Sequence, residues 1–187
     1  AYCHSSAPHC IRSTAIFKRC EASSITLTLS TAITRVEKEH LCEQCMGNPL
    51  DIEFEDMNGE LTTLRVLGGS NCEHWVVVNV ASACGFTHHY AGLQELSTAE
   101  GITVVGFPCN QFGAQEPGTH QEICDFTSRE YNVTFPLMAK IEVKGEQQHP
   151  LFTELSRTVG LDDYTGDIRW NFEKFVITKE GEVSRFS

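Results

Sequence analysis

Two apolar stretches, Trp75-Val-Val-Val-Asn-Val80 and Ile102-Thr-Val-Val-Gly-Phe107, decide the fold that the sequence predicts. Both are rich in β-branched residues and almost continuously apolar, which is typical of strands covered on both faces. Between them, Tyr90, Leu93 and Leu96 recur at helical spacing. Two buried strands joined by a helix indicate a parallel pair with a crossover connection.

The flanking segments extend this pair to a larger mixed sheet. Thr119, with Glu122 three residues on, has the signature of a capping box at the start of a helix. Glu180-Gly181 separates two final strands that form an antiparallel hairpin. The expected helices span residues 87–100, 119–131 and 150–159, and Thr87 is the expected cap of the first. The further expected strands are 51–55, 61–64, 137–143, 172–178 and 183–186. This order predicts a thioredoxin-like α/β fold with three α/β/α layers and a mixed central sheet.

The overall charge argues against nucleic acid and membrane as partners. The chain has 187 residues, with 14 Lys and Arg against 25 Asp and Glu, so its formal net charge is −11. Nucleic acid and anionic lipid both repel a surface of this sign. No apolar run approaches the roughly 18 residues needed to cross a bilayer. The sequence therefore predicts a soluble protein built from one domain.

The first 45 residues differ in composition from the rest. They hold five of the nine cysteines and show no sustained helical or strand period. A secretory signal would need an apolar core, and a transit peptide would contain fewer acidic residues. Because the first methionine is Met46, we expect residues 1–45 to be a disordered or non-native extension and residues 46–187 to form the domain. If Met46 is the true start, a cytoplasmic protein is expected; organellar targeting by residues 1–45 is the alternative.

A metal site in the amino-terminal segment is a weaker interpretation. Cys42 and Cys45 have the two-residue spacing of zinc ligands, and His40 lies beside them. A structural zinc site usually needs a second ligand pair at defined spacing, which this segment lacks. We therefore expect unpaired thiols, with neither a metal ion nor a bound cofactor.

Cys84 has the most informative position of the cysteines. It lies four residues beyond the first buried strand, in Ala83-Cys-Gly-Phe-Thr87, where the helical pattern begins. A helix amino terminus offers free amide donors and partial positive charge, and both favour a thiolate. The alternative is a small buried hydrophobic residue. Disulfide-exchange proteins of this layout carry a second cysteine three residues on, where this chain has Thr87, so the pattern favours a thiol that attacks another substrate.

Three longer blocks resemble the signatures of the glutathione peroxidase family. They are Asn79-Val-Ala-Ser-Ala-Cys-Gly-Phe-Thr87, Gly106-Phe-Pro-Cys-Asn-Gln-Phe-Gly-Ala-Gln-Glu-Pro117 and Trp170-Asn-Phe-Glu-Lys-Phe175. They occur in family order, and the resemblance covers roughly residues 48–187. It implies a non-selenium member of the family, a peroxidase that reduces hydrogen peroxide and organic or lipid hydroperoxides.

The resemblance also implies roles for four residues. Cys84 stands where the family has its peroxidatic cysteine or selenocysteine, and Gln115, Trp170 and Asn171 match its catalytic partners. A thiolate that attacks a peroxide oxygen becomes a sulfenic acid and releases water or alcohol. Amide and indole donors stabilise the thiolate and the departing oxyanion without an ionic partner. Taken singly, the three partners also fit a loop amide, a core aromatic and a strand terminus.

The sequence leaves the reductant open. The resemblance implies that thioredoxin-dependent members of the family carry a resolving cysteine in a Phe-Cys pattern on the helix that corresponds to residues 119–131. This chain has Thr127, or Ser128 in a shifted variant, at that position. Cys124 lies one helical turn earlier and is the candidate resolving thiol, with a buried helix cysteine as the alternative. Either Cys84 and Cys124 form a disulfide that thioredoxin reduces, or glutathione attacks oxidised Cys84 directly. A cluster of Arg and Lys would favour glutathione, and none is evident in the sequence.

Two departures from the family bear on shape and assembly. Family members continue beyond residue 187 into a final helix that covers one face of the sheet; its absence predicts exposed apolar surface and lower stability. No long insertion lies between Thr158 and Trp170, the region that tetrameric relatives use for assembly, so a monomer is expected.

Two other functions compete with catalysis. In a redox sensor, Cys84 would be oxidised, Cys124 would lock it, and a partner protein would detect the change. In an inactive fragment, the unusual ends of the chain would prevent folding. Turnover with a reductant present separates an enzyme from a sensor, because a sensor reacts stoichiometrically.

Overall fold

The computed structural model describes residues 47–187, and the expectations for residues 1–45, including a zinc site at Cys42 and Cys45, lie outside the described residues. The elements follow the chain in the order η1 (Pro49–Asp51), β1 (Phe54–Glu55), β2 (Leu61–Thr62), α2 (Leu64–Gly68), β3 (His74–Val80), α3 (His89–Ser97), β4 (Ile102–Pro108), α4 (His120–Tyr131), α5 (Pro150–Leu155), β5 (Lys174–Thr178) and β6 (Val183–Phe186).

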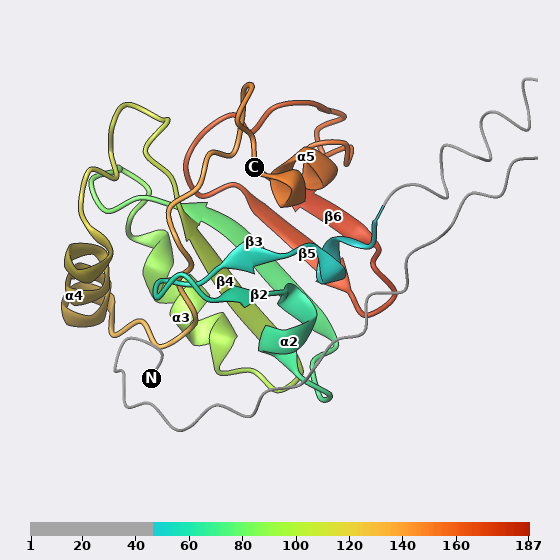
Figure 1. Ribbon diagram of the computed structural model, residues 1–187, viewed down its shortest axis with the longest axis horizontal. Helices are drawn as coiled ribbons and strands as arrows, with labels where there is room; N and C mark the ends of the chain where they lie inside the picture. Colours follow the sequence, from blue (N-terminus) through green and yellow to red (C-terminus); the bar gives the residue numbers. More distant parts are fainter. Residues whose placement is uncertain (1–46) are drawn as a thin grey trace, which may run out of the picture. The chain divides into compact units, whose positions relative to one another are not determined.

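The four main strands form one mixed sheet in the order β4-β3-β5-β6 (Figure 1). Strand β3 is parallel to β4, with Trp75 opposite Thr103, and antiparallel to β5, with Trp75 opposite Ile177. Strands β5 and β6 form the expected antiparallel hairpin. The predicted mixed sheet is therefore confirmed, and β3 is its central strand.

Alternate residues of β3 divide the interior into two apolar clusters. Trp75 and Val77 belong to a cluster with side chains of α2 and α5, whereas Val76, Val78 and Val80 belong to a cluster with side chains of α3 and α4. Because successive strand residues point to opposite faces, the sheet is covered by helices on both sides. This arrangement confirms the α/β/α layering of the thioredoxin-like prediction.

One predicted strand is absent from the structure. Residues 137–143 form only isolated bridges, from Leu137 to Gly106 and from Met138 to Asp56. The segment contacts β4 through one residue and the region of the β1–β2 hairpin through the next. It therefore changes partner before a ladder with either one can form.

The predicted capping residue marks the start of helix α4 but not that of helix α3. At α4, Thr119 and Glu122 form the predicted capping box, with each side chain bound to the other residue's backbone amide. The helix predicted over 87–100 is shorter, because α3 begins at His89 and Thr87 is not its cap. It also ends earlier than predicted, at Ser97 with Thr98 as its C-cap, and Gly101 lies beyond it with a φ of +76° that glycine adopts without strain.

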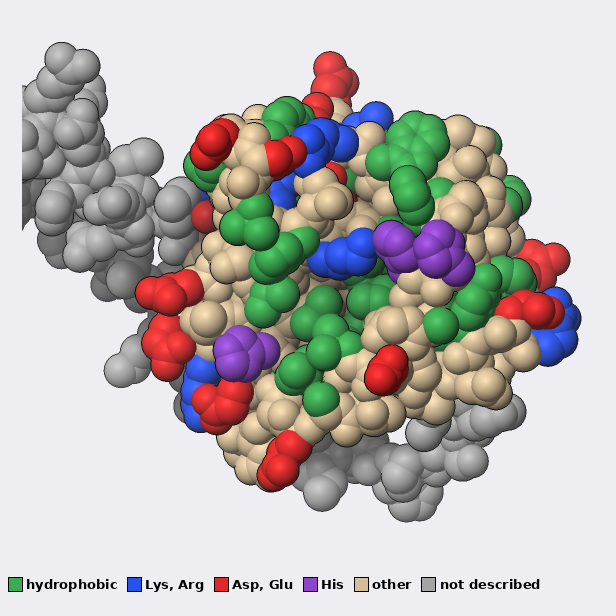
Figure 2. Space-filling view, turned by 180° about the vertical axis from the view of Figure 1, so that it is seen from behind, with side chains coloured by type: hydrophobic (Ala, Val, Ile, Leu, Met, Phe, Trp, Pro, Cys, Tyr) green, Lys and Arg blue, Asp and Glu red, His purple; other side chains and the backbone are tan. Residues whose placement is uncertain are grey.

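One face of the sheet carries an open apolar hollow beside α3. Its volume is about 590 Å³, and Val76, Leu93, Leu96, Val176 and Phe186 line it together with polar residues at one end. Leu96 is 37 % exposed and Phe186 is 39 % exposed. Figure 2 shows hydrophobic side chains around this hollow, with histidines and a basic side chain beside it.

Within residues 47–187, no helix is long and apolar enough to cross a membrane.

Candidate functional site

Cys84 lies in a series of turns that lead from β3 into α3. Its side chain is partly buried, and its Sγ accepts a hydrogen bond of 3.4 Å from the backbone N–H of Phe86. The α-helix itself starts five residues later, at His89, so the expected position at a helix start is replaced by consecutive turns. The backbone amide of Phe86 still points at the sulfur and fixes its position in the turn.

Thr87 fixes the backbone of the Cys84 turn. Its buried Oγ1 accepts a hydrogen bond of 3.1 Å from the Cys84 N–H and donates its hydrogen to carbonyl oxygens nearby, that of Cys84 at 2.6 Å or that of Ala81 at 3.1 Å. Sequence reasoning assigned Thr87 to the cap of α3, where the hydroxyl would have satisfied a helix amide. The hydroxyl instead binds the carbonyl of Cys84, within the same turn, or that of Ala81, the residue after β3.

Gln115 and Asn171 are brought together although 56 residues separate them in sequence. The Nδ2 of Asn171 donates to the Oε1 of Gln115 at 2.9 Å, and Asn171 is only 4 % exposed. The backbone carbonyl of Gln115 in turn accepts a hydrogen bond of 2.9 Å from the N–H of Ala83. One chain of hydrogen bonds therefore runs from the residue before Cys84 to two of its predicted partners.

Asn79 holds the segment that carries Trp170 and Asn171. It is fully buried at the end of β3, and its Nδ2 donates to the carbonyl of Trp170 at 3.0 Å. Its Oδ1 accepts from the N–H of Glu173 at 3.0 Å, and its backbone carbonyl accepts from the N–H of Phe172 at 2.7 Å. Sequence reasoning quoted Asn79 in a motif but gave it no role; a polar residue within a buried apolar strand was the signal available.

Trp170 lies at the surface of the site. It is 43 % exposed, which rules out the alternative of a core aromatic, and its ring centroid lies 5.6 Å from that of Phe112. A hollow of about 190 Å³ opens between Trp170, Asn171 and Phe86, and it extends to His89 and Lys174. Phe86 is 47 % exposed, so two aromatic side chains are available at the edge of this hollow.

Cys124 occupies a different environment from Cys84. It is buried on α4, and its Sγ lies 3.0 Å from the Sδ of Met57. Thr127, one of the two positions (with Ser128) at which the family resemblance predicts a resolving cysteine, is buried and donates to the carbonyl of Ile123 at 2.9 Å. No disulfide joins Cys84 to Cys124 in the structure.

Basic groups gather beside Trp170, although none stood out in the sequence. Lys174 donates from Nζ to the Nδ1 of His89 at 3.0 Å, and both line the hollow that Trp170 borders. Burial lowers the pKa of Lys174, and burial followed by the charge of Lys174 lowers the pKa of His89. Sequence reasoning missed this pair because it joins α3 to β5, elements 85 residues apart.

In the part of the chain that the structure describes, no group of three or more His, Cys, Asp or Glu side chains is placed to hold a metal ion.

Comparisons with known proteins identify the family of this chain. The profile of the glutathione peroxidase family matches residues 50–156. Glutathione peroxidase-like peroxiredoxin 2 of Saccharomyces cerevisiae is 44 % identical over 142 residues, which are 73 % of this chain and 85 % of the yeast protein. Thioredoxin/glutathione peroxidase BtuE of Escherichia coli is 40 % identical over 156 residues, or 71 % of this chain and 84 % of BtuE. The crystal structure of Trgpx in its apo form matches with a TM-score of 0.57 and 34 % identity, covering 75 % of this chain and 85 % of Trgpx.

The fold and these matches define a peroxidase that depends on a thiol and is built on a thioredoxin-like sheet. The chain belongs to the glutathione peroxidase family.

Proposed function

We propose that Cys84 is the peroxidatic thiol of this enzyme. Its thiolate attacks the outer oxygen of a hydroperoxide, the O–O bond breaks, and one proton is taken up as water or alcohol leaves. Cys84 is thereby oxidised to a sulfenic acid and the peroxide is reduced. Hydrogen peroxide and organic hydroperoxides both undergo this step, since only the O–O bond reacts.

The observation that carries the proposal is the chain of hydrogen bonds from Ala83 through Gln115 to Asn171. It fixes two neutral amides next to the turn that presents Cys84. The Nε2 of Gln115 is not used in this chain, so it can donate to the sulfur or to the departing oxygen. Donors that are already in place stabilise developing negative charge without further reorganisation, which is the usual origin of large rate enhancements. Trp170, at the edge of the hollow, supplies an indole N–H of the same kind.

For the reductive half of the cycle, we propose a small external thiol such as glutathione, with no resident cofactor. The thiol attacks the sulfenic acid, water leaves, and a mixed disulfide forms; a second thiol then releases Cys84 and the oxidised reductant. Two observations support this route: neither Thr127 nor Ser128, the candidate resolving positions, is a cysteine, and Cys124 is buried against Met57. The relative from Escherichia coli, BtuE, is named a thioredoxin/glutathione peroxidase, so both reductants appear in its name.

A disulfide between Cys84 and Cys124, reduced by thioredoxin, is the second candidate route. It would require α4 to open, because Cys124 is buried on that helix and a disulfide needs Cα atoms within about 7 Å of each other. The exposed hollow at Trp170 is open to a protein partner as well as to a small molecule. We propose a monomer as the working unit, since the segment before Trp170 holds no long insertion.

The test is peroxide turnover by the full chain, assayed in parallel with glutathione and with thioredoxin. Cys84→Ser should abolish turnover with both, and Cys124→Ser should leave turnover with glutathione intact. Turnover by Cys84→Ser would contradict the assignment of the thiol. Intact mass after peroxide treatment separates the routes, since an internal disulfide loses about 2 Da whereas direct resolution gives a glutathione adduct. A single reaction per molecule, with reductant present, would indicate a sensor.

A further inference from the structure

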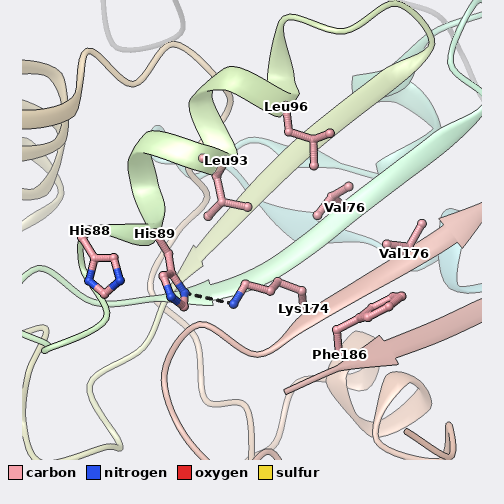
Figure 3. Close-up of a pocket in the computed structure, with 9 residues that line it drawn as sticks. Val76, His88, His89, Leu93, Leu96, Lys174, Val176 and Phe186 are labelled. Carbon is pink, nitrogen blue, oxygen red and sulfur yellow. Dashed lines mark hydrogen bonds between the residues drawn. The ribbon is translucent and has the colours of Figure 1, made fainter. Parts of the chain in front are cut away.

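Lys174 is a half-buried cation that forms no ion pair with a carboxylate within residues 47–187. Its Nζ donates to the Nδ1 of His89 at 3.0 Å, as the dashed line in Figure 3 shows. An ammonium group cannot accept, so Nδ1 is the acceptor and His89 is neutral with its hydrogen on Nε2. Two of the three ammonium hydrogens of Lys174 are left for another acceptor.

The charges around Lys174 are already paired with other groups. Glu173, its neighbour in sequence, accepts from the buried guanidinium of Arg185 and from the backbone N–H of Arg169. The guanidinium of Arg169 pairs with Asp162 at 2.6 Å. The charge of Glu173 also acts on Lys174, but Glu173 is paired with Arg185, so Lys174 lines the hollow without an ion pair of its own. A half-buried charge of this kind favours a bound anion.

The position of Lys174 connects it to the reacting thiol. The ring of His89 stacks on Phe86 with centroids 5.4 Å apart, and the backbone N–H of Phe86 binds the sulfur of Cys84. Lys174 and His89 share one hollow of about 190 Å³ with Phe86, Trp170 and Asn171. A hollow of this volume holds a carboxylate and a few attached atoms, and the exposed rings at its edge offer contact to the rest of a small molecule.

We propose that Lys174, positioned by His89, binds a carboxylate of a small-molecule substrate beside Cys84. The inference rests on the proposed peroxidase function and adds a recognition element to it. Two substrates of the cycle can bring a carboxylate: a thiol of the glutathione type and a hydroperoxide of a fatty acid. The chemistry of recognition is the same for both, a charge-assisted hydrogen bond from Nζ to a carboxylate oxygen.

The experiment compares each acid with its neutral ester in the wild-type chain and in Lys174→Met. One arm measures KM for glutathione and for its diethyl ester with hydrogen peroxide as oxidant. The other arm measures KM for linoleic acid hydroperoxide and for its methyl ester with dithiothreitol as reductant. The quantity of interest is the ratio of KM for the acid to KM for the ester, because a general loss of activity cancels in this ratio.

We expect Lys174→Met to raise this ratio about 10-fold in one arm, since a hydrogen bond to a charged group contributes about that factor. A rise in the glutathione arm identifies the reductant as the bound carboxylate, and a rise in the hydroperoxide arm identifies the peroxide. Lys174→Arg should return the ratio to within about 3-fold of wild type. An unchanged ratio in both arms overturns the proposal.

Lys179→Met is the matched control. Lys179 follows the same strand, is exposed and pairs with Glu73, so this variant removes one positive charge far from the hollow. We expect it to leave both ratios unchanged; an equal effect would show that only net charge matters and would overturn the proposal. Calorimetric titration with S-methylglutathione, which cannot react, measures binding without turnover. If turnover is absent but S-methylglutathione binds to wild type and not to Lys174→Met, the proposed function fails while the carboxylate site stands.

Discussion

The side-chain amide of Asn79, at the end of the central strand, donates a hydrogen bond of 3.0 Å to the backbone carbonyl of Trp170, 91 residues later in the sequence. The Oδ1 of the same side chain accepts a hydrogen bond from the backbone N–H of Glu173. A single buried side chain thus fixes the segment that carries two of the four candidate catalytic residues. Its importance can be tested by substitution.

Asn79→Leu keeps the volume of the side chain and removes both hydrogen bonds. The Trp170 carbonyl and the Glu173 amide would be left without these partners, which should lower the free energy of unfolding by about 2–4 kcal/mol. Turnover per folded molecule should fall by about 10-fold or more. Urea unfolding and peroxide assays measure the two effects. Asn71→Leu, in the exposed loop before β3, should change stability by less than about 0.5 kcal/mol; normal turnover by Asn79→Leu would contradict the role of Asn79.

Thr87→Val tests whether the hydroxyl of Thr87 holds the Cys84 turn. Valine has nearly the same shape, but it cannot accept from the Cys84 N–H or donate to the carbonyls beside it. We expect a loss of stability of about 1–2 kcal/mol, with slower oxidation of Cys84 by peroxide. Stopped-flow tryptophan fluorescence follows that oxidation. Thr87→Ser retains the hydroxyl and should oxidise at close to the wild-type rate; equal rates in Val and Ser variants would exclude this role.

Glu116, the residue after Gln115, gives stability a pH dependence. Burial raises the pKa of its carboxyl above the ordinary 4.5, and Ser82 and Lys140 nearby oppose that rise in part. An acid with a raised pKa in the folded state contributes stability below pH 4.5 that is lost as the pH rises through the raised value. Glu116→Gln cannot ionise, so its stability relative to wild type should be greater at about pH 7.5 than at about pH 4.

Unfolding in urea at several pH values measures this difference for Glu116→Gln. The exposed Glu182→Gln serves as the control for the loss of one negative charge. A stability difference between Glu116→Gln and wild type that does not change with pH would show that the buried carboxyl does not control this dependence.

The cysteines of the described domain should differ sharply in reactivity. Cys84 is partly exposed, whereas Cys72, Cys109 and Cys124 are buried. Burial also raises the pKa of the Cys109 thiol, which keeps it in the less reactive protonated form. Brief treatment of the native protein with iodoacetamide should label Cys84 at least about 10-fold faster than these three. Peptide mapping locates the label, and denatured protein, in which all cysteines react, is the reference. Preferential labelling of Cys109 would contradict this ranking.

The sequence predicted well those features that depend on neighbouring residues. The strands at 75–80 and 102–107, the capping box at Thr119 and the final hairpin all follow from local pattern. Residues 137–143 look equally like a strand, but their pairing is shared between two partners, which no local pattern reveals. The actual role of Thr87 was missed for the same reason, because local pattern does not show whether its hydroxyl binds a helix amide or the carbonyls of Cys84 and Ala81.

The candidate site divides in the same way. Motif resemblance pointed to Cys84, Gln115, Trp170 and Asn171, and the structure brings Gln115 and Asn171 into direct contact. Asn79 and the pair of Lys174 with His89 act through contacts between distant segments. The identity of the residues gave little indication of these contacts, because burial and direction depend on how β5 packs beside β3.

The antiparallel pairing of β5 with β3 also determines when the site can assemble during synthesis of the chain. The thiol of Cys84 leaves the ribosome long before Asn171 is synthesised, because the segments that meet at the site are about 90 residues apart. At about 5–20 residues per second, several seconds pass before the partner amides exist. During this interval the thiol of Cys84 lacks the side chains of Trp170 and Asn171. The surroundings proposed for Cys84 are therefore complete only late in synthesis, when the hairpin of β5 and β6 joins the sheet.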